Sequence, residues 1–352
     1  MRLPALLVLL LSSLAVHGQL GGENAFDFLS LPVSARANAQ GGTYVVLHDD
    51  DPGLAMANPS LLTHDGLDRE LHVTYSPFFA GTHFAGINYV HALRPATFQF
   101  GARYYTIGNE ERTDPFGASM GLFTANEVAL SAGGAYQYDR FHFGVNTHLV
   151  FGQMDDFTSL GMAFDISAMY VDTARLFSAA LVVRNAGFML KTYTPGDQEL
   201  LPVDVQVGFT KRFRHLPFRI NVTAHDLYRW DIRPDDPDDQ GGGDDLFDDG
   251  AADGPGAAGR FFDNLAAHLI VGGELTIRKA FWIGVAYNHL RRRELALSTR
   301  GGFSGFSFGM GLDLRRWSVH YGFGKYHLQG GGHQFSFRLD LGAPKRAGSA
   351  SE

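Results

Sequence analysis

Alternation of apolar and polar residues is the feature that most constrains how this chain can fold. It dominates the sequence after the first 69 residues. Near the C-terminus, for example, Phe335, Phe337 and Leu339 alternate with Ser336 and Arg338. Successive side chains of a β-strand point to opposite faces of the sheet. The period of two residues therefore predicts strands that each have one apolar face.

Fourteen such segments can be counted along the chain. Many of them have ten residues or more, whereas strands of soluble proteins average about 5 to 6 residues. A tilted strand needs about 9 to 11 residues to cross a bilayer, so these lengths favour transmembrane strands. The predicted strands are residues 70–77, 82–92, 96–106, 127–138, 141–154, 159–172, 177–185, 201–212, 218–227, 263–278, 281–290, 303–314, 317–325 and 334–341.

The links between these segments alternate in length, as they do in bacterial membrane barrels with short periplasmic turns and longer external loops. We therefore expect an all-β fold, an antiparallel transmembrane β-barrel of 14 strands over residues 70–341, with both chain ends in the periplasm and a tail at 342–352. A soluble β-sandwich, which also alternates, is the competing fold. The short links are 93–95, 139–140, 173–176, 213–217, 279–280 and 315–316, and the long ones include 107–126, 186–200, 228–262 and 291–302.

The N-terminus has the pattern of a secretory signal peptide over residues 1–18. Arg2 precedes an apolar run from Leu3 to Val16, and the small residue Gly18 follows. An apolar run of this length before a cleavage-like site is typical of a leader and too short for a membrane-spanning helix. Together with the strands, the leader places the protein in the outer membrane of a Gram-negative cell, where the lipid bilayer surrounds it.

The formal net charge of −8 is concentrated in one segment. Residues 228–260 contain ten Asp and three Arg, so the rest of the chain is nearly neutral. Nucleic-acid binding needs a basic patch, and this distribution lacks one, so no nucleic-acid partner is expected. The chain has no cysteine, which excludes disulfides and thiol-based ligands or nucleophiles.

The acidic segment has two interpretations. Asp235, Asp236, Asp238 and Asp239 offer the hard oxygen ligands that calcium prefers, which makes calcium the one candidate cofactor. The alternative is a solvated external loop without metal, because the spacing of an EF-hand is lacking and such a composition is typical of disorder. No nucleophile elbow opens a helix and no phosphate-binding loop is found. We expect no catalytic residues and no enzyme, although groups distributed over several strands would leave no motif.

Residues 19–69 do not alternate and are predicted to form a periplasmic or lumenal segment before the barrel. Asp51-Pro52 combines a favourable N-cap with a proline at the first helical position, which predicts a short helix. Asn58-Pro59 ends that helix and begins another turn, because a residue before proline avoids helical geometry. Gly41-Gly42 predicts a tight bend.

Several motifs of this segment resemble the opening of the FadL-related barrels. They are Gly22, Phe26, Phe28-Leu29, Ser34-Ala35-Arg36, Gly41-Gly42, Asp50-Asp51-Pro52 and Asn58-Pro59-Ser60. Within this group they are most similar to the PorQ family, a barrel component of the type IX secretion system of Bacteroidetes. The resemblance implies a barrel of the same strand number whose N-terminal segment partly fills the lumen. It also implies attachment of secreted cargo at the cell surface, with a PorZ-like surface protein as partner beside PorU-like and PorV-like components.

Two functions follow from these observations. The first is a non-enzymatic anchor that holds its surface partner through external loops, with the acidic segment and the apolar Phe116, Met120 and Phe123 as candidate contacts. Those apolar side chains could instead fold inward and close the pore. The second function is a transporter of hydrophobic small molecules, like the FadL proteins. It requires an apolar pocket in the lumen and a kink or opening in the wall.

Overall fold

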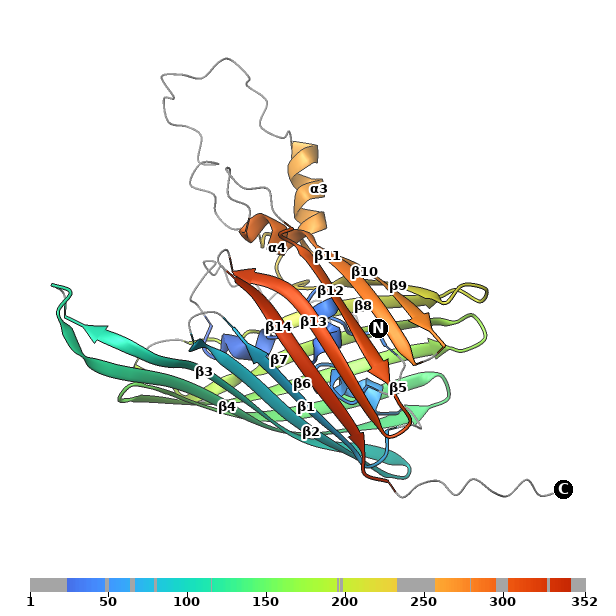
Figure 1. The fold of residues 1–352 in the computed structure, drawn as a ribbon, viewed down its shortest axis with the longest axis horizontal. Coiled ribbons are helices and arrows are strands. Elements are labelled where there is room, and N and C mark those ends of the chain that lie inside the picture. The colour runs from blue at the N-terminus through green and yellow to red at the C-terminus, as the bar shows by residue number, and fades with distance from the viewer. Residues whose placement is uncertain are drawn as a thin grey trace, which may run out of the picture.

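The strands close into one antiparallel barrel in which each strand pairs with its neighbours in the sequence and the first pairs with the last (Figure 1). The computed structural model describes residues 24–47, 51–63, 67–78, 81–114, 116–194, 196, 199–232, 257–278, 280–295, 303–327 and 330–342. Within these residues the barrel has 14 strands, which confirms the predicted number and order. They are β1 (Glu70–Pro77), β2 (His83–Leu93), β3 (Ala96–Thr113), β4 (Ser119–Tyr138), β5 (Phe141–Met154), β6 (Phe157–Asp172), β7 (Phe177–Lys191), β8 (Asp204–Arg212), β9 (Phe218–Ala224), β10 (Leu269–Ile277), β11 (Phe281–Asn288), β12 (Phe306–Asp313), β13 (Trp317–His327) and β14 (Gly330–Asp340).

In strand β5 the alternation places apolar and polar side chains on opposite faces of the wall. The side chains of Phe141, Phe143 and Val145 are 47%, 48% and 55% exposed, whereas those of His142 and Asn146 are each 2% exposed. Apolar side chains thus cover the outside of the barrel and polar ones face the lumen. Soluble monomers rarely expose contiguous apolar patches beyond a few hundred Å², and a continuous apolar outer surface is the mark of a lipid-facing wall. The chain is a transmembrane β-barrel.

The two ends of the barrel differ in their connections. At one, which we call the turn end, short links join the strands, and β1 begins and β14 ends there. The opposite loop end carries α3 (Ala257–Ala267) and α4 (His289–Glu294) (Figure 1). Among the described residues, no helix is long and apolar enough to span a membrane. The short links agree with the predicted ones to within a residue and are 94–95, 139–140, 173–176, 213–217, 278–280 and 314–316.

The predicted loop 107–126 is wrong, because most of it is strand. β3 and β4 continue past the barrel as a two-stranded hairpin, which projects from the loop end (Figure 1). Glu110 pairs with Phe123, and the link itself is only residues 114–118. In a hairpin of this kind the inward-facing backbone groups of each strand pair with those of the other, while the outward-facing groups of both edges are left to the solvent.

The predicted strand 263–278 is also wrong in its first part, which belongs to α3. Residues 257–268 contain no β-branched side chain, while alanine and leucine favour a helix. Likewise, the predicted strand 281–290 ends early because Asn288 caps α4, its side chain accepting a hydrogen bond from Arg291 N at 3.0 Å.

Residues 24–47 and 51–63 lie inside the barrel and form a segment that we call the plug (Figure 1). Its elements are η1 (Asp27–Ser30), α2 (Ala35–Ala39), η2 (Leu54–Met56) and η3 (Pro59–Thr63). α2 packs against β12, β13 and β14, while η3 packs against β3 to β6 across the lumen. Plug residues buried in one hydrophobic cluster with the wall are Ala37, Tyr44, Val45, Val46, Leu47, Leu54, Ala55, Leu61 and Leu62.

The plug turns are held by the side chains of its Asx-Pro motifs. The Asp51 carboxylate accepts a hydrogen bond from Gly53 N at 3.0 Å, and the Asn58 side chain accepts one from the amide two residues later at the same distance. Asn58 also donates through Nδ2 to Val45 O at 2.5 Å, which joins the two halves of the plug. Both segments are short 3-10 helices, in agreement with the short helix expected after Pro52 and the turn expected after Asn58.

Glycines lie where the plug backbone touches the wall. A Cβ on Gly322 of β13 would lie 2.0 Å from the carbonyl oxygen of Ala35, so α2 could not pack at this place against any other residue. The bend at Gly41 and Gly42 has φ angles of 92° and 96°, as the sequence predicts. Close packing of the plug therefore explains why Gly322 occupies this lumenal position of the wall.

Candidate functional site

A cavity of about 420 Å³ opens at the loop end between the plug and the wall, and we call it the mouth pocket. The plug contributes Phe26, Phe28 and Leu31, while β3 and β5 contribute Tyr105 and Met154. Pockets for small molecules generally have about 300 to 1,000 Å³, so this one can hold a small ligand. Its remaining lining residues are Asn24, Ala25, Asp27, Glu127, Tyr193 and Glu199.

Aromatic side chains dominate the surface of the mouth pocket. Phe28 stacks on Tyr105 with ring centroids 6.1 Å apart, and Phe26 meets Phe28 edge to face at 6.5 Å. Tyr193, in the loop after β7, lies 6.3 Å from Phe26. Gly152 of β5 leaves room for both, because a Cβ there would lie 2.0 Å from Tyr193 Oη. The first turn of the plug is thus part of the pocket itself.

The charged side chains in the described lining of the mouth pocket are all acidic. Asp27, Glu127 and Glu199 line it, and the described lining includes no Lys, Arg or His. Burial raises the pKa of Asp27, and a hydrogen bond with Asn24 offsets part of that effect. Burial and the charge of Glu127 also raise the pKa of Tyr193. An apolar surface beside carboxylates disfavours anionic ligands.

Beside the mouth pocket, two buried arginines hold the main chain of the plug. Arg103 of β3 donates through Nη1 to the carbonyl oxygen of Leu29 at 3.2 Å, and Arg184 of β7 donates through Nη2 to the same oxygen at 3.0 Å. We call this arrangement the carbonyl latch. Hydrogen bonds from charged donors contribute about 1.5 to 3 kcal/mol each. The latch therefore ties the first turn of the plug to two separate strands of the wall.

A buried carboxylate balances part of the charge of the latch. Asp165 of β6 lies 2.7 Å from His148 Nε2 and accepts a hydrogen bond from Asn185 N at 2.8 Å. Ser131 Oγ lies 2.6 Å from the other ring nitrogen of His148, so the three side chains have the contact order of a hydrolase triad. His148 and Asp165 are 0% and 1% exposed, and Asp165 also holds the main chain of Asn185 beside the latch. Their geometry supports a structural role.

The wall is irregular at the latch. The register of the β6–β7 ladder shifts there, and Asn185 has a φ of 53°, in the left-handed region. The side chain of Asn185 donates to Pro202 O at 3.0 Å, and nearby Leu200 O accepts a hydrogen bond from Ala25 N at 2.8 Å. Bulges often occur beside functional sites, where they redirect side chains. The plug, the bulge and the loop before β8 form one connected unit.

The predicted partner contacts lie on the projecting hairpin, away from the mouth pocket. Phe116, Met120 and Leu122 are 95%, 63% and 69% exposed, and Phe123 is partly exposed. They are therefore strand and turn residues of the hairpin and do not fold inward to close the pore. Whether they contact a partner stays a prediction.

The predicted acidic contacts Asp235, Asp236, Asp238 and Asp239 lie outside the described residues, and so does any calcium site there. Within the described ranges, no group of three or more His, Asp or Glu side chains is placed to hold a metal ion. The motif residues Gly41, Gly42, Asp51, Pro52, Asn58 and Pro59 all belong to the plug and shape its turns.

No sequence motif marks the residues of the latch. Arg103, Arg184 and Asp165 each occupy a lumenal position of a strand, where most neighbours on that face are small or uncharged. A charged residue on the inner face of a predicted barrel strand is the signal that would have singled them out.

Comparison with known proteins agrees with this architecture. No family model matches the chain, and no curated protein matches it. Among solved structures, a mutant of the TodX monoaromatic hydrocarbon channel is 12% identical with a TM-score of 0.50, over 89% of this chain and all of that one. A FadL homologue of Pseudomonas aeruginosa is 12% identical with a TM-score of 0.48, over 88% of this chain and 98% of that one. The chain shares the barrel fold of the TodX structure.

Proposed function

We propose that this protein is an outer-membrane channel for neutral hydrophobic small molecules, with its turn end in the periplasm. The observation that carries the proposal is the mouth pocket, an aromatic cavity of about 420 Å³ whose surface is partly the first turn of the plug. A ligand bound there touches the segment that must move before anything can pass. The shared fold with a barrel named as a monoaromatic hydrocarbon channel supports the same reading.

The plug turns this binding site into a gate. Passage requires the first turn of the plug to leave its place, which breaks the latch on Leu29 and the hydrogen bond between Ala25 N and Leu200 O. A ligand that displaces Phe26 or Phe28 would weaken both. The ladder between β6 and β7 shifts register at Asn185, and we place the lateral exit of a hydrophobic substrate into lipid at this irregularity.

The lining favours neutral substrates over fatty acids. An ionised carboxylate would lie among Asp27, Glu127 and Glu199 without a cation to pair with in the described lining. Like charges at short distance cost several-fold more in a partly buried site than in water. An aromatic hydrocarbon instead gains stacking on Phe28 and Tyr105.

Uptake in a host that lacks its own channels for hydrophobic compounds tests the proposal. Cells expressing the wild-type barrel should take up radiolabelled toluene faster than cells without it and should show little gain for palmitate. Leu31→Trp fills the mouth pocket and should abolish the gain. Leu130→Trp is the matched control, since Leu130 lies on the outer face at 55% exposure. No gain with the wild type, or equal uptake by the two variants, would contradict the proposal.

The second candidate function is the anchor of a secretion attachment complex. The projecting hairpin favours it, because the apolar side chains of Phe116 and Leu122 are exposed there. A PorZ-like surface protein would bind this hairpin, beside PorU-like and PorV-like components. Cross-linking in the native outer membrane should then capture a surface protein with the wild type and lose it with Phe116→Ser/Leu122→Ser. Toluene uptake should not change in that variant, so the two functions are separable.

A further inference from the structure

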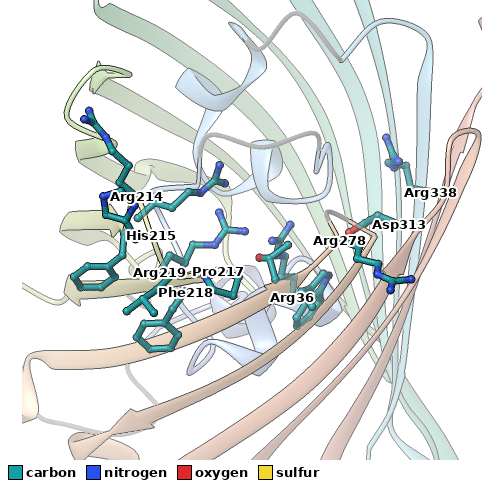
Figure 2. Close-up of a pocket in the computed structure, with 14 residues that line it drawn as sticks. Arg36, Arg214, His215, Pro217, Phe218, Arg219, Arg278, Asp313 and Arg338 are labelled. Carbon is teal, nitrogen blue, oxygen red and sulfur yellow. The ribbon is translucent and has the colours of Figure 1, made fainter.

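A second cavity, of about 640 Å³, opens at the turn end, and we call it the arginine pocket (Figure 2). Figure 2 shows Arg214 and Arg219 on one side, Arg338 and Asp313 on the other, and Arg36 between them. Asp313 is the one acidic residue among the described lining. The six arginines come from the plug, from three strands and from two links, and they are Arg36, Arg212, Arg214, Arg219, Arg278 and Arg338.

Two of these arginines are buried and share one carboxylate. Arg36 Nη2 and Arg219 Nε lie 2.6 and 3.1 Å from the same oxygen of Glu274. Arg36 and Arg219 are each 4% exposed, and Glu274 is fully buried. Arg36 also lies 5.0 Å from the centre of the Trp282 ring. These contacts hold two guanidinium groups rigidly at the cavity.

Arginines outnumber carboxylates in the described lining of the cavity. Six arginines line it together with one carboxylate, Asp313. Arg36 and Arg219 also pair with the buried Glu274, and Arg338 lies 3.4 Å from Glu70. Concave surfaces lined by one sign of charge concentrate ions of the opposite sign.

The rim of the arginine pocket is apolar. Phe213 stacks on Phe218 with ring centroids 6.2 Å apart, and Leu216 between them is 60% exposed. Phe213 and Leu216 lie in the β8–β9 link and Phe218 begins β9, where the lipid-facing wall ends. A cationic interior beside an apolar rim fits an amphiphile as well as a small soluble anion.

We propose that the arginine pocket binds a phosphate group, carried either by an anionic phospholipid of the adjoining leaflet or by a soluble phosphate ester. The planar fork of arginine matches phosphate oxygens in paired hydrogen bonds. A tetrahedral phosphate presents oxygens in several directions to donors that converge from different elements, whereas a carboxylate presents two in one plane. The site lies at the opposite end of the barrel from the mouth pocket and is independent of the proposed transport.

The test uses the purified full-length barrel and the variant Arg214→Gln/Arg278→Gln. Neither residue contacts Glu274, so the plug stays in place. The matched control, Arg112→Gln/Arg293→Gln, removes two positive charges at the loop end. Native mass spectrometry measures how much phosphatidylglycerol and phosphatidylcholine each protein retains from an equimolar mixture. Equilibrium dialysis measures binding of glycerol 3-phosphate, and the same compound is tested as a competitor of the lipid.

The ratio of retained phosphatidylglycerol to phosphatidylcholine, or the affinity for glycerol 3-phosphate, should be about tenfold higher for the wild type and the control than for the pocket variant. The loss of one charged hydrogen bond has about that effect. Lipid preference with competition by glycerol 3-phosphate assigns one shared site. Lipid preference without competition assigns the phospholipid, and dialysis binding alone assigns the soluble ester. Absence of both in the wild type, or equal values in the pocket and control variants, overturns the proposal. So does binding of an acidic peptide without any binding of phosphate.

Discussion

Replacing Arg184 by methionine isolates the contribution of the carbonyl latch. Methionine keeps the apolar volume of the side chain but removes the hydrogen bond from Nη2 to Leu29 O at 3.0 Å. Arg103 still donates to the same oxygen at 3.2 Å, so the carbonyl does not lose all its partners. The loss should therefore lie at the low end for a charged donor, about 1.5 kcal/mol. The equilibrium for opening of the first plug turn should rise roughly tenfold.

Hydrogen exchange of the plug measures this opening directly, because amides that exchange through local opening report its free energy. Amides of Ala25, Leu29 and Leu31 are hydrogen-bonded in the closed plug, so the peptide 24–31 should exchange roughly tenfold faster in the variant. Arg175→Met is the control, as the side chain of Arg175 is 82% exposed at the turn end. Equal exchange in the wild type and Arg184→Met would refute the latch, and so would an equal rise in the control.

The double variant Arg103→Met/Arg184→Met sharpens the same test. It leaves the buried carbonyl of Leu29 without either donor, which adds a desolvation cost of about 1 to 3 kcal/mol. The combined effect should exceed the sum of the two single effects, because both donors share one acceptor. Additive effects would mean that another group replaces the lost donors.

Three further outcomes are expected. Gly322→Val places its side chain against the carbonyl of Ala35 and should cost about 1 to 3 kcal/mol by overpacking; an unchanged Tm in detergent would contradict this contact. Met120→Ser on the hairpin should change the unfolding free energy by less than about 0.5 kcal/mol, and a larger loss in guanidinium titration would mean that the hairpin packs on the barrel. Burial by itself would lower the pKa of His225, but the hydrogen bond and charge of Asp226 raise it above its ordinary value. That stabilisation is complete below about pH 6.5 and is lost as the pH rises through the raised pKa, so His225→Gln should flatten the alkaline decline of Tm between about pH 6 and 9.

The sequence alone determined the wall of the barrel. Alternation predicts both the number of strands and which face of each meets lipid, because the side-chain direction in a strand depends only on the parity of its position. The exposures of Phe141 and His142 confirm this. Links at the turn end were equally predictable, since they are short and interrupt the alternation abruptly.

The alternation pattern predicted the backbone conformation less well for segments that lie outside the barrel wall. β3 continues as a strand beyond Thr106 because β4 pairs with it there, after a register shift between Thr106 and Asn109. Residues 263–267 join a helix instead of the predicted strand. In the hairpin the paired strand decides the backbone conformation, and in α3 the helix propensity of its alanine and leucine residues does so.

Only the tertiary structure brought together the residues of the carbonyl latch and the ion pairs behind the arginine pocket. Arg103 and Arg184 are 74 and 155 positions from Leu29, and Arg36 is 238 positions from Glu274. The period of two shows that such side chains face the lumen, but not their depth along the barrel axis or the plug atom that they meet. Depth is set by the stagger of neighbouring strands when the barrel closes, and the plug partner by the path of a segment that has no periodicity.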